Sequence, residues 1–373
     1  MTTESSELYP VTRIDEVRAA TAAAGLGALL LTPGPDLRYV SGYHAHALER
    51  LTCLVVPAAG EAFMMVPRLE LPAAQASPAG RIGLEFVPWD ETDDPYAVVA
   101  KRLGDVASVG LSDRMWAMQS LRFRDALPGV EQHLAGRALA ELRMRKSPAE
   151  VAALRAAGAA IDAVHEQVPG FLRAGRTERE VGRDIADAIM TAGHAVIDFV
   201  IVASGPNGAS PHHDLSDRVI QQGDQVVVDI GGTMPSGYCS DSTRNYSVGE
   251  PDSAYAAYFE VLRRAQEAAC DFVRPGVTCE AVDAAARQVI EEAGYGSYFI
   301  HRTGHGIGLE SHEEPYIVSG NTRAMEPGFA FSIEPGIYLP GEHGARIEDI
   351  VVCGESGGER LNLTTRDLVV VYQ

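Results

Sequence analysis

Five residues in the second half of the chain are of types that bind divalent metal ions. They are Asp229, Asp241, His305, Glu334 and Glu348. Eleven residues separate the two aspartates, thirteen separate the two glutamates, and the histidine lies between the two pairs. Carboxylates with one imidazole and no cysteine suit Mn²⁺, Co²⁺, Fe²⁺ or Zn²⁺ and disfavour a structural zinc site.

Apolar neighbours predict that these carboxylates are buried in a sheet. The segment 226–230 is apolar apart from Asp229, and residues 329–333 lead directly into Glu334. An ionised carboxylate inside a sheet is costly unless it is paired or bound to a metal, and four together would repel one another. Two divalent ions ~3.5–4 Å apart would offset this repulsion, lower the pKa of a bridging water and polarise a carbonyl group. The sequence therefore predicts a dinuclear metal site.

A weak internal repeat would bring the two carboxylate pairs together. Residues 171–193 and 272–294 are identical at eight of 23 positions, at an offset of 101 residues. Each copy is typical of a helix with threonine at its N-cap and glycine at its C-terminal end. In both halves a glycine, an apolar strand and a carboxylate then follow, at 223–229 and 328–334. We interpret this order as a duplication whose two halves face each other across a central cleft.

The first part of the chain is predicted to be a mixed α/β domain. The apolar run 26–31 predicts a strand that ends at a Pro- and Gly-rich turn. Residues 50–57 and 61–67 predict a β-hairpin. The spacing of apolar residues predicts helices over 94–103 and 129–144.

A capping box marks the start of the second domain. Ser147 is a suitable N-cap, proline follows at the first helical position, and Glu150 stands three residues after the cap. We expect a helix from there to about Val168, and we place the boundary just before Ser147. The predicted domains are residues 1–145 and 146–373.

Composition excludes several classes of function. The 373 residues include 31 Lys and Arg against 51 Asp and Glu, a formal net charge of −20. This balance argues against binding to nucleic acid or to an anionic membrane surface. The N-terminus resembles no secretory signal, no apolar run approaches the ~20 residues of a membrane span, and the five irregularly spaced cysteines predict no disulfide framework. The expected location is the cytoplasm.

The motifs around the predicted ligands resemble one known superfamily. The segments DIGG…GYCSDSTR, HRTGHGIGLESHE, SIEPGIY and RIED are similar to those of the pita-bread metallopeptidases, which include prolidase, aminopeptidase P, creatinase and methionine aminopeptidase. The first half resembles the N-terminal domain of the prolidase and aminopeptidase P branch through LTPGPDLRYVSGY and ERLTCLVVP. The resemblance implies an α+β fold. A smaller α/β creatinase-like domain would precede a pita-bread domain, whose duplicated α/β halves are related by a pseudo-two-fold axis around a curved antiparallel sheet.

The resemblance also implies a role for each ligand. Asp229 resembles the bidentate ligand of one metal, and Asp241 and Glu348 resemble the bridging carboxylates. His305 resembles the imidazole ligand of the second metal, and Glu334 resembles its carboxylate ligand and the acceptor of a proton from the attacking water. Because no ligand position is substituted, two divalent ions are implied, with Mn²⁺ expected first and Co²⁺, Zn²⁺ or Fe²⁺ as alternatives.

Four further residues match positions that contact substrate in this superfamily. His212 resembles the histidine at the cleft rim, and His312 resembles the histidine that stabilises the tetrahedral intermediate. His301 matches the proline-specific branch, and Arg346 resembles the arginine near the C-terminal side of the substrate. His213 has no such match and is expected to face solvent.

The activity implied is an exopeptidase that hydrolyses Xaa-Pro bonds by attack of a metal-bridging hydroxide. An Xaa-Pro dipeptidase and an Xaa-Pro aminopeptidase both remain open, because Arg346 would serve either. Two alternatives are a non-peptidase amidohydrolase on the same fold and a catalytically inactive peptide-binding module. The expected partners are a proline-containing dipeptide or short peptide and a second copy of the chain in a homodimer, where the loop 42–50 would approach the neighbour's substrate site.

Overall fold

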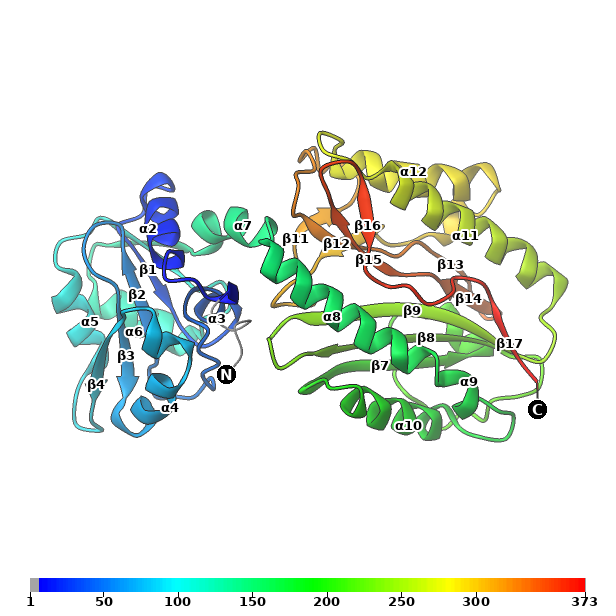
Figure 1. Cartoon of the computed structure of the whole chain (residues 1–373), viewed down its shortest axis with the longest axis horizontal. Helices are drawn as coiled ribbons and strands as arrows, with labels where there is room; N and C mark the ends of the chain where they lie inside the picture. Colours follow the sequence, from blue (N-terminus) through cyan, green and yellow to red (C-terminus); the bar gives the residue numbers. More distant parts are fainter. Residues whose placement is uncertain (1–6, 373) are drawn as a thin grey trace. The chain divides into compact units, whose positions relative to one another are not determined.

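The computed structural model describes residues 7–372, and the chain divides after Arg143 into two compact units (Figure 1). Among the described residues, no helix is both long enough and apolar enough to cross a membrane. The domain limits 1–145 and 146–373 stay a prediction.

The first unit is built on a six-stranded mixed sheet in the order β4-β3-β2-β1-β5-β6. The predicted hairpin is confirmed, because Cys53 in β2 pairs with Met65 in the antiparallel strand β3. The strands are β1 (Ala28–Leu31), β2 (Cys53–Pro57), β3 (Phe63–Pro67), β4 (Glu85–Trp89), β5 (Ser108–Leu111) and β6 (Glu131–Leu134). The helices are α2 (Arg13–Ala23), α3 (Pro35–Ser41), α4 (Leu71–Ala76), α5 (Pro95–Leu103), α6 (Ala117–Ala126) and α7 (Gly136–Met144), with short 3-10 turns η1 (Arg68–Glu70) and η2 (Pro78–Arg81).

The helix predicted over 129–144 is wrong in its first part. Residues Glu131–Leu134 form β6, which pairs in parallel with β5, and α7 begins only at Gly136. Gly129 has a φ of +81°, a left-handed conformation that ends the preceding turn and does not continue into a helix. The backbone hydrogen bonds to β5 therefore outweigh the helical spacing of the apolar residues.

The second unit begins with the predicted capping box. Ser147 Oγ accepts a hydrogen bond from the backbone N–H of Glu150, and the Glu150 carboxylate accepts one from the backbone N–H of Ser147. Helix α8 (Pro148–His165) follows, so it ends three residues before the predicted end at Val168. A short helix, α9 (Val168–Phe171), begins there instead.

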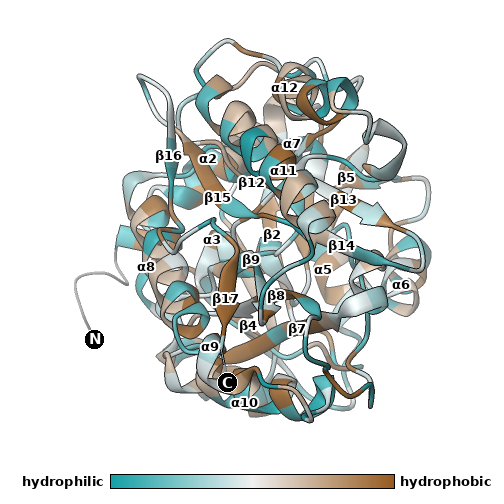
Figure 2. Cartoon of the chain, turned by 90° about the vertical axis from the view of Figure 1, so that its right-hand side faces the viewer, coloured by the Kyte–Doolittle hydropathy of each residue, from teal (hydrophilic) through white to brown (hydrophobic). Residues whose placement is uncertain are grey.

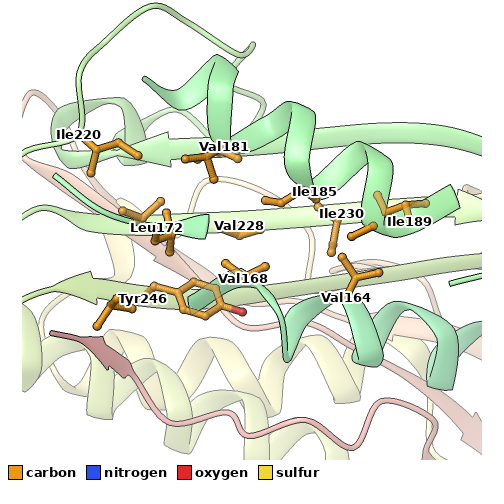
Figure 3. Close-up of a cluster of buried hydrophobic side chains, with 14 of the residues drawn as sticks. Val164, Val168, Leu172, Val181, Ile185, Ile189, Ile220, Val228, Ile230 and Tyr246 are labelled. Carbon is orange, nitrogen blue, oxygen red and sulfur yellow. The ribbon is translucent and has the colours of Figure 1, made fainter. Parts of the chain in front are cut away.

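A four-stranded sheet in the order β17-β9-β8-β7 forms the first half of the second unit. Helices α8, α9 and α10 contribute buried apolar side chains that pack on one face of this sheet (Figure 3). Besides α8 and α9, this half contains α10 (Glu178–Thr191), β7 (Val196–Ser204), η3 (Gly205–Ala209), β8 (Gln225–Thr233), β9 (Cys239–Val248) and β17 (Val369–Val371).

Successive side chains of β8 point alternately to the apolar core and to the opposite face of the sheet. Val226, Val228 and Ile230 belong to the buried cluster beneath the helices (Figure 3). Because successive side chains of a strand point to opposite faces, Asp229 lies on the other face of the sheet. It lies within β8, four residues before the strand ends at Thr233.

The second half contains a five-stranded sheet in the order β11-β10-β12-β15-β16 and a two-stranded sheet of β13 and β14. Apolar and polar residues are mixed along α11 and α12 (Figure 2), and their buried residues recur at intervals of three or four positions, so each helix has an apolar and a polar face. The elements are α11 (Ser253–Phe272), α12 (Cys279–Glu292), η4 (Gly296–Tyr298), β10 (Gly304–Gly306), β11 (Glu313–Ile317), β12 (Ala330–Ile333), β13 (Gly336–Leu339), β14 (His343–Arg346), β15 (Asp349–Cys353) and β16 (Gly358–Arg360).

The two halves share local structure at the positions of the repeat. Thr177 caps α10 and Thr278 caps α12, each by accepting a hydrogen bond from a backbone N–H three residues later. Both helices have 14 residues, and Gly193 and Gly294 follow them with positive φ angles of +104° and +87°. The same two threonines each form an isolated bridge to a later segment of the same half. These matches agree with the interpretation of a duplication.

Candidate metal centre

Strand register brings the five predicted ligands together. Asp229 in β8 pairs with Thr243 in β9, and Gly231 pairs with Asp241, so both aspartates lie on the same face of neighbouring strands. In the other half, Ile333 of β12 pairs with Asp349 of β15, which places Glu334 and Glu348 at the same end of that strand pair. An isolated bridge between Thr243 and Glu348 joins the two halves.

The ligand atoms lie within coordination reach of one another. His305 Nε2 is 3.2 Å from Glu334 Oε1, 3.7 Å from Asp241 Oδ2 and 3.9 Å from Glu348 Oε1. Three groups have ligand atoms that all lie within 4.8 Å of one another. The groups are Asp229 with Asp241 and Glu348, His305 with Glu334 and Glu348, and Asp241 with His305 and His312.

Hydrogen bonds from neighbouring side chains orient these ligands. His305 Nδ1 lies 3.1 Å from the carbonyl oxygen of Gly306, so Nδ1 carries the proton and Nε2 presents its lone pair to the carboxylates. Ser332 Oγ accepts from the backbone N–H of His305 at 3.0 Å and donates to Glu334 Oε1 at 3.1 Å. Thr243 Oγ1 donates to Glu348 Oε2 at 2.7 Å.

Burial and mutual repulsion perturb the acids of this cluster. Burial, together with the neighbouring carboxylates, raises the pKa values of Asp241 and Glu348 well above their usual range. Burial raises the pKa of Glu334 to about 7, although the Arg346 guanidinium acts in the opposite direction. Burial and the nearby His312 lower the pKa of His305 to about 3, which keeps its imidazole neutral and able to bind a cation.

The cluster fits divalent cations. The side chains of Asp241, His305 and Glu348 are at most 4% exposed, so water does not screen their charges. Within residues 7–372, Asp229 Oδ1 is buried and has no hydrogen-bond partner. Bound cations would satisfy this oxygen and neutralise the four acids, and oxygen donors with one imidazole suit ions of intermediate hardness.

A cavity of about 980 Å³ opens over the cluster, and it is lined by all nine residues predicted for the site. His212 and His312 are exposed on its wall. The ring of His312 lies 3.9 Å from that of His305, measured between centroids. Phe199 and Ile300 add apolar surface to the same wall.

His301 and Arg346 form a chain of hydrogen bonds that ends at the cluster. Arg346 is buried and donates to Asp229 Oδ2 at 2.5 Å, to Thr243 Oγ1 at 3.1 Å and to the Tyr338 hydroxyl at 2.8 Å. The Tyr338 hydroxyl donates in turn to His301 Nε2 at 2.9 Å. Burial and the Arg346 charge lower the pKa of His301 to about 4. Both side chains are therefore held by the protein itself, and their contact with substrate stays a prediction.

Three buried charged residues with structural roles around the site were missed by the sequence analysis. Asp283 in α12 accepts hydrogen bonds from the backbone N–H and the hydroxyl of Thr303, two residues before His305. Lys146 Nζ lies 2.9 Å from Glu313 Oε1, directly after His312, and both side chains are at least 93% buried. Glu178 in the first turn of α10 is wholly buried. Their contacts around the site come from segments distant in the sequence. The local patterns, the i,i+4 pair of Asp283 with Arg287 and the place of Glu178 directly after the N-cap Thr177, do not reveal burial.

The expectation for His213 is corrected. Its side chain is only 16% exposed, and its Nε2 lies 2.8 Å from Glu178 Oε2. A carboxylate placed in the protein interior attracts the nearest donors, and the loop that contains His213 folds over Glu178. His213 is therefore an anchored residue and does not project freely into solvent.

Known proteins resemble both parts of the chain. Residues 152–355 match the model of metallopeptidase family M24, and residues 13–145 match the creatinase/prolidase N-terminal domain. The sequence is 54% identical over 367 residues to a protein named probable dipeptidase PepE from Mycobacterium bovis, with 98% of this chain and 97% of the relative covered. It is 34% identical to an Xaa-Pro dipeptidase of Lactobacillus delbrueckii subsp. lactis, covering 96% and 98% of the two chains.

Solved structures agree with the fold described above. The crystal structure of dipeptidase PepE from Mycobacterium ulcerans has a TM-score of 0.93 and 53% sequence identity, with 99% of each chain covered. A prolidase from Thermococcus sibiricus has a TM-score of 0.89 and 37% identity, covering 96% of this chain and 98% of the other. The predicted architecture, a creatinase-like N-terminal domain followed by a pita-bread domain, is confirmed. The chain belongs to metallopeptidase family M24.

Proposed function

We propose that the protein is a metal-dependent dipeptidase that hydrolyses Xaa-Pro bonds with two divalent ions. The observation that supports this most directly is the buried cluster of four carboxylates and His305 that lines a cavity of about 980 Å³. A cavity of this size suits a short peptide. Relatives named dipeptidase and Xaa-Pro dipeptidase align over almost the whole chain, which favours a dipeptidase over an aminopeptidase.

The donor groups suggest how two ions would be held. Asp229, Asp241 and Glu348 would hold one, and His305, Glu334, Asp241 and Glu348 would hold the other, so that Asp241 and Glu348 would be shared. When bound, two such ions lower the pKa of a water and polarise a peptide carbonyl. Mn²⁺ is the ion proposed first, and Co²⁺, Zn²⁺ and Fe²⁺ suit the same donors.

The chain's own groups would move protons and orient the peptide. The Glu334 carboxylate, oriented by Ser332, would take the proton of the attacking water and deliver it to the leaving proline nitrogen. His212 and His312 would donate hydrogen bonds to the substrate and to the developing oxyanion.

Recognition of proline would depend on groups other than a backbone N–H. An Xaa-Pro amide has none, so ring shape and contacts to the carbonyl and carboxylate oxygens would provide specificity. His301 and Arg346 are proposed for the C-terminal end of the peptide, because both line the cavity. The Arg346 guanidinium is suited to a carboxylate.

Two peptides of different length test the substrate class. Purified protein would be loaded separately with Mn²⁺, Co²⁺ and Zn²⁺ and assayed with Gly-Pro, Gly-Pro-Ala and the proline-free control Gly-Leu. We expect Gly-Pro to be hydrolysed with a much larger kcat/KM than the other two. Equal kcat/KM for Gly-Pro and Gly-Pro-Ala would contradict a strict dipeptidase and favour an aminopeptidase.

A pair of variants tests the metal cluster. Asp241→Asn removes a proposed shared ligand, so bound metal and activity should both fall, whereas Asp217→Asn changes a side chain that is 80% exposed and should alter neither. Metal binding by the unmutated protein without turnover of any peptide would favour a non-peptidase amidohydrolase. Less than one ion per chain and no activity would favour an inactive peptide-binding module.

Assembly and location are part of the proposal. We propose domains of residues 1–145 and 146–373, a homodimer, and a cytoplasmic location. Light scattering coupled to size-exclusion chromatography gives the mass of the particle. A mass near that of one 39.8 kDa chain would exclude the dimer.

A further inference from the structure

One carboxylate outside the metal cluster is wholly buried and accepts hydrogen bonds from four residues. Glu178 receives the backbone N–H and the hydroxyl of Ser204, at 2.8 and 2.7 Å. It also receives Asn207 Nδ2 at 3.0 and 3.1 Å, His213 Nε2 at 2.8 Å and Ser216 Oγ at 2.5 Å. Burial acts to raise the pKa of Glu178, but the hydrogen bonds from Ser216 and Ser204 outweigh it and lower that pKa. The group is therefore held ionised.

The partners of Glu178 all lie on one segment, residues 204–216, which begins at the last residue of β7 and continues into the connection to β8. Backbone contacts join the same segment to the start of α10, where the N–H of Arg179 donates to the carbonyl oxygen of Ser216. His212 lies in the middle of this segment and is exposed on the cavity wall. Glu178 thus fixes both sides of the residue proposed to contact the substrate.

Helix packing alone does not explain a carboxylate at this position. The repeat places Cys279 in the other half at the position of Glu178, directly after the N-cap Thr278. Cys279 is also fully buried, and α12 has the same length as α10. The helix forms equally well with a small apolar residue at this position. The buried charge of Glu178 therefore acts on the segment that covers it, by accepting that segment's hydrogen bonds.

We infer that Glu178 is a positioning residue that anchors His213 and Ser216 and thereby holds His212 at the rim of the cavity. Because an ionised carboxylate only accepts hydrogen bonds, His213 Nε2 must be the donor. The imidazole of His213 therefore points into the interior, toward Glu178. Its neighbour His212 is left to project from an anchored backbone. The inference rests on the proposed function for the role of His212, but the ordering of the segment does not depend on it.

A double-mutant cycle tests whether Glu178 acts through His212. The variants are Glu178→Gln, His212→Ala and the double mutant, and the readout is kcat/KM for Gly-Pro with Mn²⁺. We expect Glu178→Gln alone to lower kcat/KM by about 10- to 100-fold, because a misplacement of ~1 Å can cost about 100-fold. In the His212→Ala background the same change should have little further effect. An equal fold-loss in both backgrounds, or no loss in the single variant, would overturn the inference.

Glu180→Gln is the matched control. Glu180 lies on the same first turn of α10, but its side chain is exposed and accepts hydrogen bonds from Thr177 within the capping box. The control should keep the kcat/KM of the unmutated protein. Metal content should stay unchanged in every variant, because neither glutamate is a proposed ligand.

Hydrogen exchange provides a readout that needs no activity. In Glu178→Gln, exchange should accelerate in residues 205–218 and stay unchanged in β8 and α12. If Glu178→Gln does not fold, His213→Ala removes one partner of the same carboxylate from the loop side and should give the same local acceleration. Unchanged exchange in residues 205–218 would refute the anchoring role. If the unmutated protein hydrolyses no proline peptide but the segment still loosens, the proposed function fails while the anchoring role stands.

Discussion

Glu334→Gln should stabilise the protein when the metal is removed. Burial raises the pKa of Glu334 from 4.5 to about 7 in the metal-free fold. As pH rises from 4.5 to 7, the unfolded chain loses this proton before the folded chain does, so the stability of the folded state falls. A shift of this size corresponds to about 3 kcal/mol at pH 8, because each pKa unit is worth ~1.4 kcal/mol. Glutamine keeps the size and polarity of the side chain and avoids the buried charge.

The measurement is urea unfolding after dialysis against a chelator, at pH 5 and pH 8. The variant should exceed the unmutated protein in stability by up to about 3 kcal/mol at pH 8 and by much less at pH 5, where Glu334 is protonated in the fold. The two proteins are compared at each pH, because the lowered pKa values of His301 and His305 stabilise both of them as pH rises. Asp241 and Glu348 keep raised pKa values in the variant, so part of the pH dependence should persist. Glu355→Gln, at an exposed position, is the control and should leave the stability unchanged at both pH 5 and pH 8.

With Mn²⁺ added, the unmutated protein should be more stable than Glu334→Gln. The unmutated protein gains the free energy of metal binding, whereas Glu334→Gln lacks a proposed ligand and gains less. A metal-free variant that is less stable than the unmutated protein at pH 8 would refute the reasoning. An equal difference in stability between the two metal-free proteins at pH 5 and pH 8 would refute it as well, because the difference would then not depend on the ionisation of Glu334.

Three other substitutions test the framework around the site. Ser147→Ala removes the N-cap of α8 and should cost about 1 kcal/mol in urea unfolding, with unchanged activity. Lys146→Met removes the buried cation of the ion pair with Glu313 and should cost about 3 kcal/mol or more, whereas Lys146→Met combined with Glu313→Leu should recover most of the loss. If the double variant is no more stable than the single one, loss of this ion pair is not the cause of the destabilisation. Gly304→Ala would place a Cβ 1.9 Å from the carbonyl oxygen of Ser332, so β10 must shift, and metal content measured after gel filtration should fall; full metal content would contradict this.

The ligand positions could be predicted because each lies in a local pattern that reveals its surroundings. Asp229 stands between Val228 and Ile230, and Glu334 follows an apolar strand, so the sequence itself indicates that both are buried. The repeat then relates one pair of acids to the other before any contact is known. The register of β8 with β9 and of β12 with β15 agrees with that expectation, because the period of two along a strand fixes which face each acid occupies.

The error at 129–144 has the opposite origin. The apolar residues there fit a helix locally, but Glu131–Leu134 pair with β5, which lies more than 20 residues earlier in the chain. Sheet pairing between distant segments overrides a weak local preference, because it satisfies backbone groups along the whole edge of β5. The helix starts only where that pairing ends, at Gly136.

Glu178 shows why the supporting residues were harder to predict than the ligands. It follows Thr177 and precedes Arg179, so its neighbours suggest an exposed first helical turn, where a glutamate commonly stabilises the helix dipole. Its burial arises from a loop whose contacts begin 26 residues later, at Ser204, and extend to Ser216. A strand announces its own buried face through alternation, whereas a helix start covered by a loop leaves no such periodicity. Anchoring residues of this kind are therefore best sought where a loop with a substrate-contacting residue crosses the polar end of a helix.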